Sequence, residues 1–128
     1  MSARVLVTGA GGFIGHHLVK YLKSKGYWVR GVDIKSPEFE PTKADDFRLL
    51  DLRDFRNALE ATTGIDHVYH LAADMGGIGY ITQFHASISR NNTLINVYML
   101  EAARINDVRR FFFSSSACVY PQYLQKDA

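Results

Sequence analysis

The chain has 128 residues, of which 47% are apolar and 22% charged, so it is long enough for one globular domain with a buried core. A formal net charge of +2, with lysine and arginine scattered along the chain, argues against a nucleic-acid partner. No apolar run approaches the ~20 residues of a membrane span, and a lone cysteine, Cys118, excludes a disulfide within the chain. We therefore expect a cytoplasmic protein without a secretory signal, because the chain enters a strand almost at once.

A strand, a glycine turn and a helix are predicted at the start of the chain. The strand begins at Val5, and Gly9, Gly12 and Gly15 follow it, one residue wider at the front than the common dinucleotide fingerprint. Glycine lets the backbone approach a pyrophosphate, and the helix N-terminus offers free N–H groups to that anion. The pattern predicts a dinucleotide site; a glycine-rich turn without a ligand is the alternative.

The first helix is expected to stop at Gly26. Its adjacent histidines, His16 and His17, point in different directions, so we expect surface or second-shell positions for them and no metal site. A second strand over residues 27–33 ends at Asp33, 18 positions beyond Gly15. A carboxylate there accepts hydrogen bonds from the adenosine ribose and repels the extra phosphate of NADP, which favours NAD. Nearby Lys35 weakens that preference, and a solvated aspartate is the alternative.

The next segment predicts a short strand over residues 47–50 and a helix that Asp54 caps and Gly64 ends. Asp51 follows the strand directly. Its carboxylate is placed either to meet the adenine edge of a cofactor or simply to cap the local backbone, and the pattern leaves both open.

Residues 66–73 predict a central parallel strand, and residues 109–116 a buried fifth strand that ends in hydroxyls. Between them lie a glycine-rich connection, residues 74–79, and a long helical pattern, residues 81–104, with an apolar stripe. Asn91 and Asn92 interrupt this helix and can bind neighbouring backbone. The alternation of strands and helices predicts a Rossmann-type doubly wound parallel sheet, order 3-2-1-4-5, with the cofactor at the carboxyl ends of its strands.

Four segments together resemble the extended short-chain dehydrogenase/reductase family, the NAD-dependent nucleotide-sugar epimerases and dehydratases. They are residues 8–15 (T-G-A-G-G-F-I-G), 51–53 (D-L-R), 70–73 (H-L-A-A) and 114–120 (S-S-S-A-C-V-Y). Within the family, D-M-G-G at 74–77 and S-S-A-C at 115–118 are similar to the GDP-mannose 3,5-epimerases, because most other members carry a threonine or an acid in place of Cys118. Pattern and resemblance together give the expected NAD-binding residues: Gly9, Gly12, Phe13, Ile14, Gly15, Asp33, Asp51, Leu52, Leu71, Ala72, Ala73 and Asn92.

The resemblance also implies a reaction and its residues. The hexose of GDP-mannose is oxidised at C4, the protons at C3 and C5 become acidic and are exchanged by a base and an acid on opposite faces, and hydride returns to C4. By similarity Cys118 is that base or acid and Ser116 hydrogen-bonds the C4 oxygen, while Gly76 and Ala117 also contact the sugar. A thiol pKa near 8.5 suits proton transfer in both directions. A buried packing cysteine and a plain strand-end hydroxyl are the alternatives.

The sequence departs from the family where hydride chemistry needs a Tyr-x-x-x-Lys pair after the fifth strand. Its single match, Tyr21 to Lys25, lies on the first helix and is interpreted as coincidence. We therefore expect residues 1–128 to be one incomplete NAD-binding domain, truncated after the fifth strand, without a substrate domain and inactive alone. The unpaired edge of that strand favours a homo-oligomer. A 4-epimerase or 4,6-dehydratase, and a non-catalytic dinucleotide-binding module, are the alternatives.

Overall fold

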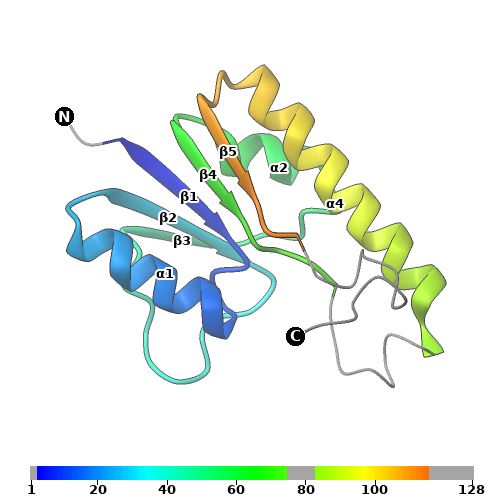
Figure 1. The fold of residues 1–128 in the computed structure, drawn as a ribbon, viewed down its shortest axis with the longest axis horizontal. Coiled ribbons are helices and arrows are strands. Elements are labelled where there is room, and N and C mark those ends of the chain that lie inside the picture. Colours follow the sequence, from blue (N-terminus) through cyan, green and yellow to red (C-terminus); the bar gives the residue numbers. More distant parts are fainter. Residues whose placement is uncertain (1–2, 75–82, 116–128) are drawn as a thin grey trace, which may run out of the picture.

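Five parallel strands form one sheet in the order β3-β2-β1-β4-β5, which confirms the predicted order (Figure 1). The structure is a computed structural model that describes residues 3–74 and 83–115. The strands are β1 (Arg4–Thr8), β2 (Trp28–Asp33), β3 (Asp46–Leu49), β4 (His67–His70) and β5 (Arg110–Phe113). Because all five run in the same direction, their carboxyl ends meet at one edge of the sheet.

Helices cover both faces of this sheet, because apolar side chains of the central strands point to both sides. On one face, Val5, Val7 and Val29 pack with Val19 and Leu22 of α1 (Phe13–Ser24). On the other face, Leu6, Val32 and Val68 form one core with residues of α2 (Phe55–Thr62) and α4 (His85–Ile105). Figure 1 shows α1 on one side and the pair α2 and α4 on the other.

Two predicted helix boundaries are confirmed by their cap geometry. Asp54 precedes α2, and its side chain accepts a hydrogen bond from the Arg56 N–H at 2.9 Å. Past the end of α1, Gly26 adopts φ +87°, the left-handed conformation that glycine takes without strain.

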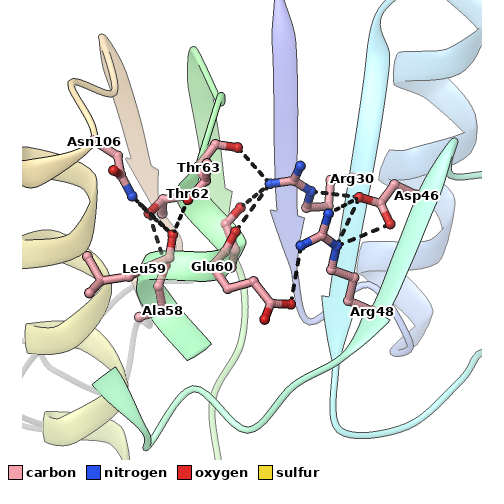
Figure 2. A network of polar contacts seen from close by, with 10 residues as sticks. Arg30, Asp46, Arg48, Ala58, Leu59, Glu60, Thr62, Thr63 and Asn106 are labelled. Atoms are coloured by element: carbon pink, nitrogen blue, oxygen red, sulfur yellow. Dashed lines mark hydrogen bonds and ion pairs between the residues drawn. The ribbon is translucent and has the colours of Figure 1, made fainter. Parts of the chain in front are cut away.

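The C-terminus of α2 rests on a buried arginine from the sheet (Figure 2). Arg30 of β2 is 5% exposed, and its Nη1 donates to the carbonyl oxygens of Ala61 (2.8 Å) and Thr63 (2.9 Å). Its Nε donates to Asp46 Oδ2 at 2.9 Å, and Arg48 binds the same carboxylate. The guanidinium thus satisfies carbonyls at the end of α2 that have no partner within the helix.

A second, neutral contact holds the same helix end. Thr62 is fully buried, and its hydroxyl donates to the Ala58 carbonyl at 2.9 Å. Asn106, after α4, donates from Nδ2 to Thr62 Oγ1 at 2.8 Å and to the Leu59 carbonyl at 3.0 Å. Figure 2 shows Arg30 and Asn106 approaching the end of α2 from opposite sides.

Two expectations about these elements are wrong, and a third is narrowed. The fifth strand is not buried: β5 is outermost in the described sheet, and Phe112 and Phe113 are 54% and 50% exposed. The central strand β4 ends at His70 rather than at residue 73, because the chain leaves the sheet there. Of the two positions expected for His16, the structure excludes the surface, because the side chain is buried and its Nε2 is 2.8 Å from Glu40 Oε1 in the loop after β2.

Candidate functional site

A groove of about 700 Å³ lies where the carboxyl ends of the strands meet. The glycine turn after β1 contributes Gly9 and Gly12, and β2 ends in the groove with Asp33. The loop after β3 contributes Asp51 and Leu52, and the loop after β4 contributes Leu71, Ala72 and Ala73. Eight of the expected cofactor-binding residues therefore line a single groove, at the position where parallel α/β sheets bind ligands.

The glycine turn is packed so tightly on one side that side chains are excluded there. A Cβ on Gly15 would lie 2.1 Å from the Gly9 carbonyl oxygen, and one on Gly11 would lie 2.1 Å from the Lys35 carbonyl oxygen. Gly12 differs, because a Cβ there would meet only the Gly9 oxygen, at 3.4 Å, an ordinary contact. Gly12 is thus not required by the fold of the turn, and its missing side chain keeps the groove wall open.

The carboxylate of Asp33 is fixed at the groove by backbone amides. Its Oδ2 accepts the Gly11 N–H at 2.8 Å, and its Oδ1 accepts the Ile34 N–H at 2.6 Å. A carboxylate has about four lone-pair positions, so each oxygen can accept a further hydrogen bond from a ligand hydroxyl. Asp33 is therefore a carboxylate that is hydrogen-bonded to the glycine turn and held in one position on the groove wall.

Asp51 has the local role that the sequence left open. Its Oδ1 accepts the Arg53 N–H at 2.9 Å, and the Arg53 guanidinium donates to the carboxylate with Nη2 at 2.7 Å from Oδ2. These hydrogen bonds from Arg53 lower the pKa of the Asp51 carboxyl. The carboxylate still lines the groove, so contact with an adenine edge stays a prediction.

The loop after β4 is held by buried polar side chains that sequence reasoning did not select. Thr8 Oγ1 accepts the N–H groups of Leu71 and Ala72, both at 3.0 Å, and lies 2.8 Å from Nδ1 of His70. His70 Nε2 in turn lies 2.8 Å from Asn96 Oδ1 on α4. Thr8 is the last residue of its strand, a position that could have identified it; the partner 62 residues away could not be seen in the sequence.

Asn92 binds the same loop rather than the open groove. Its Oδ1 accepts the Asp74 N–H at 2.6 Å, and its Nδ2 donates to the Asp74 carbonyl at 3.2 Å. Asn91 donates to Asp74 Oδ2 at 2.9 Å and also lines the groove. The local hydrogen bonding that the sequence offered as an alternative is what the structure shows for both amides.

The remaining expected residues fall elsewhere. Phe13 and Ile14 begin α1, are 65% and 71% exposed, and do not line the groove. Gly15 is buried in the turn. The expected substrate and catalytic residues lie outside the described residues: Gly76, Ser116, Ala117 and Cys118.

Two further observations bear on other classes of site. Within residues 3–74 and 83–115, no group of histidine, cysteine and acidic side chains could hold a metal ion, and no helix is long and apolar enough to cross a membrane. The Tyr21 and Lys25 pair lies at the far end of α1, with Lys25 Nζ 5.4 Å from the centre of the Tyr21 ring. Neither residue lines the groove.

Known proteins resemble the chain over almost all of its length. GDP-mannose 3,5-epimerase 1 of Oryza sativa subsp. japonica is 52% identical over 124 residues, 95% of this chain and 33% of the relative. GDP-mannose 3,5-epimerase of Arabidopsis thaliana is 49% identical with the same coverage. The solved UDP-glucose 4-epimerase of Brucella ovis in complex with NAD superposes with a TM-score of 0.83 at 30% identity, over 93% of this chain and 37% of that one.

The chain thus spans about a third of the length of the curated relatives it matches. The model of the NAD dependent epimerase/dehydratase family matches residues 5–127. With the sheet order and the groove at its carboxyl edge, this match shows that the chain belongs to the NAD-dependent epimerase/dehydratase family.

Proposed function

We propose that residues 1–128 form a single NAD-binding Rossmann domain, the cofactor-binding part of a nucleotide-sugar epimerase that acts on GDP-mannose. The observation that supports NAD as the cofactor is that the open glycine turn at Gly12 and the Asp33 carboxylate, which the Gly11 N–H holds, lie in one groove. The substrate class rests on the roughly half-identical GDP-mannose 3,5-epimerases.

The residues present fit a dinucleotide. The backbone of the glycine turn and the start of α1 would hold the pyrophosphate, because the N–H groups of a helix N-terminus attract an anion. Asp33 would accept hydrogen bonds from the hydroxyls of the adenosine ribose. Leu52, Leu71 and Ala72 would form the apolar wall of the groove. NAD would supply the acceptor for hydride from the C4 position of the sugar.

Proton transfer at the sugar is proposed for Cys118, with Ser116 bound to the C4 oxygen and Gly76 and Ala117 in contact with the substrate. These roles rest on the likeness of S-S-A-C and D-M-G-G to the GDP-mannose 3,5-epimerases. Since no Tyr-x-x-x-Lys pair follows Cys118 in this sequence, we expect the chain alone to bind NAD without epimerising GDP-mannose. Formation of an epimerised GDP-hexose by this polypeptide would contradict that expectation.

Calorimetric titration with NAD and NADP tests cofactor binding. We expect the wild-type chain to bind NAD more tightly than NADP. Gly12→Ala should weaken NAD binding about tenfold, because its methyl group enters the groove, yet lower the free energy of unfolding by less than about 1 kcal/mol at this helix N-cap.

Ser24→Ala is the matched control, since it adds no atom to the groove and lies on the last turn of α1. It should leave the NAD affinity unchanged. Equal NAD affinity in wild type and Gly12→Ala would show that the glycine turn is only a feature of the fold. Asp33→Asn, which keeps the side-chain shape and removes the charge, should reduce the preference for NAD over NADP.

A further inference from the structure

We propose that His70 is a positioning residue for the groove. Its neutral ring accepts a hydrogen bond from the Thr8 hydroxyl, and Thr8 in turn holds the loop after β4 against the glycine turn. The binding measurement that tests this rests on the proposed NAD site, whereas the spectroscopic measurement does not. The inference is carried by a chain of buried hydrogen bonds from His70 to the loop that lines the groove.

The hydroxyl of Thr8 has one possible direction for its proton. Thr8 is fully buried, and its Oγ1 accepts the N–H groups of Leu71 and Ala72, which occupy both lone pairs. The neighbouring atom at 2.8 Å is Nδ1 of His70. The hydroxyl must therefore donate to Nδ1, and Nδ1 must be unprotonated.

This assignment fixes the tautomer of the imidazole. With Nδ1 as acceptor, a neutral ring carries its proton on Nε2, which donates to Asn96 Oδ1 at 2.8 Å. His70 is 1% exposed, and its ring lies near those of Phe111 and Phe113. Burial lowers the pKa of His70, in agreement with a neutral ring.

A proton on Nδ1 would break this arrangement. The ring would then present an N–H to a hydroxyl whose lone pairs are already used, so Thr8 would have to release an amide of the loop. Among the described residues, the His70 ring is hydrogen-bonded to Thr8 of β1 and Asn96 of α4, and the rings of Phe111 and Phe113 of β5 lie beside it. None of them carries a charge that could stabilise an imidazolium.

Any movement of this loop reaches the glycine turn and the groove. A Cβ on Gly9 would lie 3.0 Å from the Ala72 nitrogen and from the Leu71 carbonyl carbon, so loop and turn are in close contact. Leu71, Ala72 and Gly9 all line the groove. The protonation state of His70 is thereby linked to the shape of the site, although the ring is not among the residues lining it.

The first test is spectroscopic and needs no cofactor. Long-range ¹H–¹⁵N spectra of the wild-type chain at pH 7.5 should show His70 with an unprotonated Nδ1 and a protonated Nε2. The amides of Leu71 and Ala72 should exchange slowly with solvent, and faster in His70→Leu. A proton on Nδ1, or unchanged exchange in His70→Leu, would overturn the proposal.

The second test measures NAD affinity from pH 7.5 down to the lowest pH at which the protein stays folded. Compared with the wild type at pH 7.5, His70→Leu should bind NAD about tenfold more weakly at every pH. His70→Asn places an acceptor oxygen near the Nδ1 position and should bind as the wild type does at pH 7.5. Wild-type affinity should fall only as the pH drops through the pKa of His70, which burial places below the ordinary imidazole value of about 6.5, and His70→Asn should lack this fall. The same pH profile in both proteins would overturn the proposal.

Two threonine variants separate positioning from loss of packing. Thr8→Val should weaken NAD binding about tenfold, and Thr8→Ser should restore it. Thr62→Val removes an equally buried hydroxyl whose partners lie at the end of α2, and should leave the affinity of the folded protein unchanged. Equal effects of Thr8→Val and Thr62→Val would contradict a specific role. Absence of NAD binding by the wild type would instead contradict the proposed function, and the spectroscopic test would still decide on His70.

Discussion

Two buried polar networks on the same face of the sheet differ in charge and in what they hold. At the end of α2, the charged Arg30 binds carbonyl oxygens and the Asp46 carboxylate (Figure 2). At the carboxyl ends of β1 and β4, Thr8, His70 and Asn96 form a neutral chain of hydrogen bonds. The first fastens a helix to the scaffold, and the second fastens a loop of the groove.

The two networks differ in how their central side chains respond to pH. A guanidinium stays charged at any physiological pH, so the Arg30 network cannot be switched. An imidazole changes charge near neutrality, so the network beside the groove can respond to pH. Stability and binding should therefore respond separately to changes in the two networks.

The largest expected effect comes from Arg30→Met. It removes a buried charge and leaves Asp46 and the carbonyls at the end of α2 short of donors, so we expect a loss of about 3 kcal/mol in the free energy of unfolding. Urea denaturation measures this loss. NAD affinity of the folded variant should stay within about twofold of the wild type. Weaker NAD binding with unchanged stability would show that the Arg30 network supports the groove rather than the fold.

A smaller effect is expected from the protonation of His70. Because burial lowers the pKa of His70 in the folded state, the unfolded chain binds the proton more readily below its pKa of about 6.5. The contribution of His70 to stability is therefore complete above that pH and declines as the pH falls, with a slope of at most about 1.4 kcal/mol per pH unit.

Denaturation at several pH values should show this decline in the wild type and not in His70→Asn. Asp46 of the other network does not interfere in this window. The hydrogen bond from Arg48 lowers the pKa of Asp46, so the contribution of Asp46 is lost only below about pH 4. Identical profiles for the two proteins between pH 5 and 7 would show that His70 is not held neutral.

The smallest effect should come from Arg48→Met. Arg48 binds the same carboxylate as Arg30 but is one-third exposed, and solvent screens its ion pairs with Asp46 and Glu60. We expect a loss below about 1 kcal/mol in urea denaturation. A loss as large as that of Arg30→Met would mean that the Asp46 carboxylate, rather than the end of α2, is what the network stabilises.

Local signals in the sequence predicted much of the fold. Alternation of apolar strands and helical patterns is enough for the sheet order, and Asp54 and Gly26 mark helix ends because their chemistry acts within a few residues. The eight groove residues were also predicted. The glycine turn and the strand ends indicate Gly9, Gly12, Asp33 and Asp51, whereas Leu52, Leu71, Ala72 and Ala73 came from the family resemblance.

Contacts between distant segments could not be predicted in the same way. The burial of His16 depends on Glu40, 24 residues away, and the link from Thr8 to His70 spans 62 residues. The exposure of Phe112 follows from the position of β5 in the sheet, whereas an apolar run fits a central or an outermost strand equally well. Burial of single polar side chains is set by tertiary packing, which periodicity does not encode.

The two amide hydrogen bonds on Asp33 have a consequence for selectivity. A carboxylate that Gly11 and Ile34 already hold in place loses little rotational freedom when a ligand arrives, so a ribose with free hydroxyls meets acceptors that are already oriented. The same rigidity prevents the carboxylate from swinging away from a 2′-phosphate. Discrimination between the two nicotinamide dinucleotides would then arise from the stiffness of this side chain as much as from its charge.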